Sequence, residues 1–164
     1  KIEGFAFLPI TSFVMALTTF VSQNRGAKEY KRARKGAHFG LVCSVSLAET
    51  IGLLIALFAT PLMRLFVDDP KVIQYGVERA HYATILFFLL AYSHGVSAIL
   101  RGAGKSMVPM IVMMVCWCFV RVTGLTIMGA LVHNIWCVYW IYPITWSLSS
   151  IVFFLYYRKI NWKE

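Results

Sequence analysis

The sequence predicts an all-α integral membrane protein with about five transmembrane helices. Hydrophobic residues make up 59% of the 164 residues and charged residues only 14%, whereas soluble domains average about 45–50% and about 25%. The apolar residues gather in runs close to the roughly 20 residues that a helix needs to span a bilayer. These runs lie approximately at 4–22, 38–62, 80–100, 107–131 and 135–157. Composition therefore excludes a water-soluble globule.

A basic loop expected between the first two runs sets the orientation of the chain. Residues 23–37 hold six Lys and Arg residues, the turn 101–105 holds two, and the tail from Arg158 holds three. This places eleven basic residues on one face of the membrane, against four on the other: Lys1, Arg64, Lys71 and Arg79. Because short loops rich in Lys and Arg stay in the cytoplasm, we expect a multi-pass protein of the cell membrane with a cytoplasmic C-terminus.

The net charge of +9 indicates the lipid bilayer as a partner and not nucleic acid. The basic residues lie in loops beside apolar runs, which is the distribution that an anionic cytoplasmic leaflet favours.

The cysteines have no zinc-type spacing, and no cofactor is implied. We expect them to be reduced, buried packing residues, since all four lie inside apolar runs: Cys43, Cys116, Cys118 and Cys137.

Glu49 is the most informative single residue. It lies near the middle of the second run, close to Ser46 and Thr50. An ionisable group at that depth is costly and usually faces a cavity or a partner, which makes Glu49 a candidate proton or cation site. The alternative is a protonated carboxyl group hydrogen-bonded to a neighbouring helix. Both interpretations stay open.

Two further polar residues lie within apolar runs. His94 either titrates near neutral pH as part of a site or makes a structural hydrogen bond to a neighbouring helix. Arg121 lies about 22 Å beyond the cytoplasmic turn, at 1.5 Å per residue. It either binds an anion or a carboxylate, or extends its side chain to the outer interface.

The last run is rich in aromatic residues. Tyr139, Tyr142 and Trp146 recur at helical spacing, so they either line a pocket for an amphipathic cation or contact lipid and neighbouring helices.

Two turns have clear local signals. Asp69 followed by Pro70 predicts a helix start, with an Asp cap and Pro at the first helical position. The basic stretch Leu100–Lys105 is glycine-rich and predicts a tight helix end. A phosphate loop needs a preceding strand and a longer motif, which this stretch lacks.

Three motifs in this order resemble the multidrug and toxic compound extrusion (MATE) transporters. The first is the run Phe20–Ala27, which contains Gln23 and Gly26, and the second is Leu65-Phe66 followed by Asp69. The third is Leu-Arg-Gly-Ala-Gly-Lys, followed by Pro109-Met110, and it contains Arg101, Gly102, Gly104 and Lys105. The resemblance implies a twelve-helix fold of two lobes, of which this chain looks like helices eight to twelve.

The same resemblance implies that this chain is a partial C-terminal lobe. The sequence begins with Lys1 and not Met, so we expect a fragment whose missing N-terminal lobe is its partner. The implied function is part of a secondary-active multidrug efflux antiporter. Such a protein exports small organic substrates, often cationic, in exchange for Na⁺ or H⁺.

One feature departs from the family pattern. Some members carry a cation-coordinating carboxylate in helix ten, near the position of Leu90, but no Asp or Glu lies between Arg79 and Arg101. Coupling then rests either on carboxylates of the missing lobe or on Glu49.

Other functions predict different features. A lipid-linked oligosaccharide flippase of the same superfamily is expected to line its cavity with several basic residues, and this chain offers Arg121 at depth. A non-transporting structural subunit predicts no titratable group facing a cavity. An intramembrane enzyme needs a His–Glu–His metal helix or a Ser–Lys pair, and the sequence has neither spacing.

Overall fold

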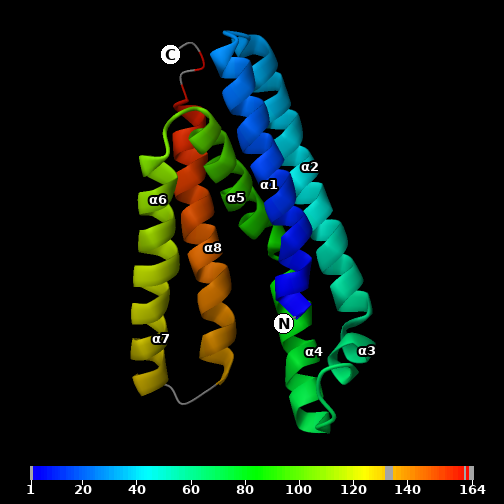
Figure 1. Cartoon of the computed structure of the whole chain (residues 1–164). Coiled ribbons are helices and arrows are strands. Elements are labelled where there is room, and N and C mark those ends of the chain that lie inside the picture. The colour runs from blue at the N-terminus through cyan, green and yellow to red at the C-terminus, as the bar shows by residue number, and fades with distance from the viewer. Residues whose placement is uncertain (1, 132–134, 161, 163–164) are drawn as a thin grey trace.

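The computed structural model describes residues 2–131, 135–160 and 162, and shows a bundle of long helices (Figure 1). In chain order the elements are α1 (Ile2–Gly26), α2 (Tyr30–Leu57), α3 (Ala59–Arg64), α4 (Pro70–Thr84), α5 (Phe87–Gly102), α6 (Met107–Met113), the π-helical segment η1 (Met114–Phe119), α7 (Val120–Leu131) and α8 (Ile135–Arg158). The predicted all-α fold is confirmed, and each predicted run lies mainly in helix.

Length and hydropathy identify spanning helices among the described residues. Tyr30–Leu57 and Met107–Ala130 each qualify alone, and α4 with α5 qualifies as a pair bent by 54°. Helices α1 and α8 contain 25 and 24 residues, long enough to cross a bilayer at 1.5 Å per residue. Five membrane spans therefore remain a prediction.

Small residues form the packed side of α2, and large apolar residues form its outer side. Leu53 and Leu57 are 61% and 68% exposed. Lipid tails are as apolar as leucine, so helices in a membrane associate through small residues that allow close approach. The buried residues of α2 fit this rule and are mostly small: Ala33, Ala37, Gly40, Leu41, Ser44, Ala48 and Gly52.

The basic segments lie at one end of the bundle (Figure 1). The α1–α2 turn, the α5–α6 turn and the C-terminal end of α8 are together at the top of the view, and α3 lies at the bottom with the start of α4. Connections that the sequence places on one side of the membrane are thus grouped in space.

The prediction of a loop at 23–37 is wrong. Only residues 27–29 are non-helical between α1 and α2, and most of the basic residues lie on helix ends. The turn is this short because its backbone groups are satisfied locally: the Ala27 N–H donates to the Gln23 carbonyl over 2.9 Å, and the Glu29 N–H donates to the Asn24 carbonyl over 2.8 Å. Lys28 closes the turn with φ of 59°.

Two of the predicted helices are interrupted. The second ends at Leu57 and gives way to the short α3, and the third breaks between Thr84 and Phe87. The predicted start at Asp69 is confirmed, since its carboxylate accepts a hydrogen bond from the Lys71 N–H over 2.9 Å.

Candidate functional site

A small aromatic pocket lies where α1, α5, η1, α7 and α8 meet. Its volume is about 250 Å³. The lining is apolar or aromatic apart from one guanidinium group: Gly4, Phe7, Ile10, Phe87, Leu90, Trp117, Arg121, Tyr142 and Trp146. The site therefore combines a large apolar contact surface with a single basic side chain.

Arg121 points toward α8. Its Nη2 donates a hydrogen bond to Thr145 Oγ1 over 2.7 Å, and its guanidinium carbon lies 4.9 Å from the ring centroid of Trp117 and 4.6 Å from that of Tyr142. The side chain of Arg121 therefore contacts neighbouring residues and does not extend to the outer interface. Its Nε is buried and has no hydrogen-bond partner among the described residues, so a buried donor remains for a ligand.

Trp117 belongs to the π-helical segment and was not among the residues singled out from the sequence. Its Nε1 donates to Ser149 Oγ over 3.3 Å. Ser149 is in turn 3.0 Å from Ser93 Oγ, which is 2.9 Å from Ser150 Oγ. This chain of hydroxyl groups ties η1, α5 and α8 together beside the pocket. Single π-helical turns are frequent at functional sites.

The ring of His94 packs edge-to-face against that of the same tryptophan. The centroid of its ring is 5.1 Å from that of Trp117 and 4.9 Å from that of Phe7, with both pairs edge-to-face. Its Nε2 is buried without a hydrogen-bond partner among the described residues.

The structure thus places three of the predicted site residues, Arg121, Tyr142 and Trp146, in the lining of one pocket together with Trp117. A fourth, His94, contacts the ring of Trp117 but is not among the described lining residues. The sequence did contain a signal for this tryptophan. It precedes Arg121 by four residues, a spacing that places two side chains on one helix face.

Glu49 and Tyr139 do not line the pocket. Glu49 is half-buried and accepts a hydrogen bond from the Phe88 N–H over 2.7 Å. The Tyr139 hydroxyl donates to the Tyr75 carbonyl over 3.3 Å, which connects α8 to α4. Both residues join helices.

The motif residues lie at helix ends. Gly102 ends α5, and Gly104 adopts φ of 77°, so the predicted tight turn is confirmed. Gln23 and Gly26 belong to the last turn of α1, and Arg101 and Lys105 flank the glycines of the α5–α6 turn.

The cysteines are free where the structure describes them. Cys116 is buried and Cys43 half-buried, but Cys118 is exposed, so the expectation that all four are buried is wrong. Cys118 lies on the outer side of η1, which the bundle does not cover. The side chain of Cys137 lies outside the described residues. No group of three or more His, Cys, Asp or Glu residues able to hold a metal occurs in the described part of the chain.

Comparison with known proteins agrees with these features. The family model MatE matches residues 1–127. A probable multidrug resistance protein NorM of Thermotoga maritima is 29% identical over 68% of this chain and 24% of its own length. A probable multidrug resistance protein YoeA of Bacillus subtilis is 22% identical over 100% of the chain and 35% of its own length. The rabbit (Oryctolagus cuniculus) multidrug and toxin extrusion protein 2 is 26% identical over 91% of the chain and 25% of its own length.

The chain thus spans between about a quarter and a third of the length of these curated relatives. Because the family model covers most of the chain and the helices are long and apolar, this membrane-embedded chain belongs to the MatE family.

Proposed function

We propose that this chain is part of a multidrug efflux transporter and that the pocket around Arg121 contacts the exported compound. The observation that carries the proposal is the pocket itself, an aromatic hollow lined by residues of α1, α5, η1, α7 and α8. Membership of the MatE family and relatives named as multidrug resistance proteins support it.

The lining suits a planar compound that also carries a hydrogen-bond acceptor. Two guanidinium groups lie over the ring of Tyr142, with the guanidinium carbons of Arg79 and Arg121 at 5.1 Å and 4.6 Å from its centroid. Because the protein's own cations occupy this ring, it offers little to a substrate cation. The unpartnered Nε1 of Trp146 and Nε of Arg121 are donors that an acceptor on the compound would satisfy. Stacking against aromatic side chains would supply the remaining affinity.

The proposal includes exchange of the compound for Na⁺ or H⁺, as expected of an antiporter. Glu49 is the candidate coupling residue within this chain, and carboxylates elsewhere in the proposed transporter are the alternative. Imposing a proton or a sodium gradient separately on vesicles that contain the transporter distinguishes the two ions.

The test is efflux by the full natural chain in a bacterial strain that lacks its own drug exporters. Trp146→Ala removes an aromatic wall, and we expect the efflux rate of a zwitterionic fluoroquinolone, whose carboxylate is a hydrogen-bond acceptor, to fall about fivefold or more, as for a central binding residue. Trp140→Ala is the matched control, since Trp140 lies on the same helix and is 56% exposed. Equal export by both variants at equal membrane abundance would disprove a substrate role for the pocket.

The two alternatives receive less support. A flippase for lipid-linked oligosaccharides is expected to need several basic residues at its cavity, and the described lining of this pocket contains one, Arg121. A purely structural subunit would gain nothing from buried donors without partners, because each one costs stability.

A further inference from the structure

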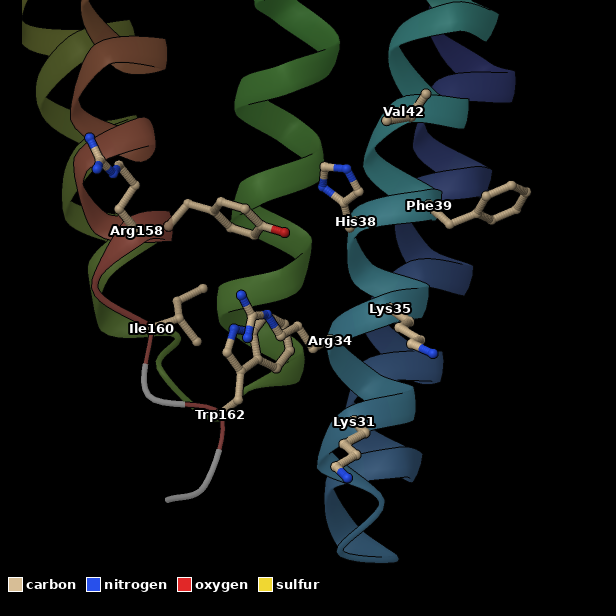
Figure 2. A pocket seen from close by; sticks show the side chains of 10 residues that line it. Lys31, Arg34, Lys35, His38, Phe39, Val42, Arg158, Ile160 and Trp162 are labelled. Atoms are coloured by element: carbon tan, nitrogen blue, oxygen red, sulfur yellow. The ribbon is translucent and has the colours of Figure 1, made fainter.

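A second and larger hollow opens at the basic end of the bundle, between α2 and the C-terminal end of α8. Its volume is about 980 Å³. Figure 2 shows Arg34 extending from α2 toward the C-terminal segment that carries Trp162. The described residues that line this basic groove are Lys31, Arg34, Lys35, His38, Phe39, Val42, Tyr157, Arg158, Ile160 and Trp162.

The mouth of the groove is strongly positive. Lys31, Arg34 and Lys35 come from the first two turns of α2 and are all exposed. None of the described lining residues is acidic. Lys31, Arg34 and Lys35 of α2 supply most of the positive charge, and Arg158 of α8 adds one further guanidinium group to the described lining. Like charges gathered around a concave surface concentrate a positive potential there, which favours an anion.

Deeper along α2 the same face becomes apolar. Lys31, Lys35, Phe39 and Val42 are spaced by four, four and three residues, so they lie along one side of the helix. Phe39 is 71% exposed and Val42 is 52% exposed. At 1.5 Å per residue the stripe is about 16 Å long. It passes from basic to apolar in the direction that leads into the membrane.

This order of side chains matches the order of groups in a lipid. We propose that the basic groove binds an anionic phospholipid, with the phosphate between Arg34 and Lys31 and one acyl chain along Phe39 and Val42. A free phosphate ion would use the basic mouth alone and would leave the apolar wall uncovered. Basic pockets between helices at the cytoplasmic side are suited to anionic headgroups, and Trp162 and Tyr157 place amphipathic rings where an interface favours them.

Native mass spectrometry of the full natural chain in detergent tests the proposal, with dioleoyl phosphatidylglycerol and dioleoyl phosphatidylcholine as probes. We expect tighter binding of phosphatidylglycerol. The double variant Arg34→Gln/Lys35→Gln should weaken it by about 25-fold, since each basic residue near the surface contributes about fivefold. The double variant Lys28→Gln/Arg32→Gln removes the same charge from the same end, outside the groove lining, and should change binding by less than about twofold.

Several results would overturn the proposal. Equal binding of the two lipids would exclude recognition of the anionic headgroup. If both double variants weaken phosphatidylglycerol binding equally, the lipid is attracted to the whole basic end of the bundle and not to the groove. Inorganic phosphate and glycerol phosphate are tested as competitors. If either displaces phosphatidylglycerol as effectively as unlabelled lipid does, the groove is a site for free anions. Melting temperatures without lipid report whether each variant folds. If the groove double variant does not fold, the single change Lys31→Gln must still weaken phosphatidylglycerol binding about fivefold.

Discussion

The carboxylate of Glu49, in the second half of α2, accepts a hydrogen bond of 2.7 Å from the Phe88 N–H at the start of α5. The first N–H groups of a helix have no partner within that helix, and a negative charge at a helix N-terminus is favourable. Glu49, which belongs to α2, therefore caps the N-terminus of α5 after the break between α4 and α5. Glu49 thus lies beside the 54° bend between α4 and α5.

Removing this acceptor should destabilise the protein. We expect Glu49→Leu to lower the free energy of unfolding by about 2 kcal/mol, because it leaves the Phe88 N–H without its charged partner. Glu49→Gln keeps an acceptor oxygen and should cost less than about 1 kcal/mol. Thermal unfolding in detergent measures both, and Thr50→Val is the control, since the Thr50 hydroxyl donates to the Ser46 carbonyl of its own helix. Wild-type melting of Glu49→Leu would exclude a capping role.

The coupling role of Glu49 has a separate readout. If the carboxyl group couples transport to protons, Glu49→Gln should melt nearly like the wild type and lose pH-dependent efflux. Efflux like that of the wild type between about pH 6 and 8 would assign coupling to another residue.

Gly102 is expected to tolerate no larger side chain. A Cβ atom built there would lie 2.6 Å from the Thr18 carbonyl oxygen and 2.8 Å from Val21 Cβ, and the backbone of α1 cannot move without disturbing its packing against α5. We expect Gly102→Ala to lower the free energy of unfolding by about 1–3 kcal/mol through overpacking. Gly129→Ala is the matched control in α7, with nothing within 4 Å of its Cβ. A melting temperature that falls equally in both variants would refute the contact argument.

Lys28 offers a stabilising change. Its φ of 59° is a left-handed conformation that costs a residue with a Cβ atom about 1–2 kcal/mol. Lys28→Gly should therefore raise the melting temperature, whereas Lys28→Ala, which also removes the charge, should not. A gain with Ala as large as that with Gly would point to charge repulsion as the cause.

The two ends of the bundle should lie on opposite sides of the membrane. Cysteine introduced at position 31, at the basic end, should be protected from an impermeant thiol reagent added to intact cells, and cysteine at position 71 should react, because Lys- and Arg-rich segments stay inside. The unsubstituted protein controls for its native cysteines. Labelling at position 31 from outside would invert the topology.

Local chemistry explains which turns could be predicted. The start of α4 is visible in the sequence because Asp69 caps it and Pro70 occupies its first position. Gly104 likewise announces the α5–α6 turn. The break after Thr84 has no glycine or proline beside it. The Phe88 N–H on its far side bonds to the carboxylate of Glu49, which lies 39 positions before Phe88 in the chain. A contact between distant segments leaves no local signature.

The same contrast applies to the site. The sequence singled out Arg121 because a basic side chain is unusual in a spanning helix, and Tyr142 and Trp146 because they recur at helical spacing. It left open whether Arg121 points to the interface or to a neighbour, since both occur at that depth. Thr145 Oγ1 decides between them, and its position depends on how α7 and α8 pack.

The π-helical segment between α6 and α7 acts like a one-residue insertion within a single continuous rod. Each extra residue rotates everything after it by about 100° relative to an α-helical register. In an unbroken α-helix the nine residues from Val112, buried in α6, to Arg121 in α7 would place the two side chains about 180° apart, and the extra residue reduces this angle to about 80°. A relative that keeps α-helical hydrogen bonds through this stretch would need its arginine one sequence position away from the one equivalent to Arg121, so that the guanidinium group reaches the same pocket. An alignment of this chain with such a relative should therefore contain a one-residue gap within η1, and the neighbouring loops should align without a compensating gap.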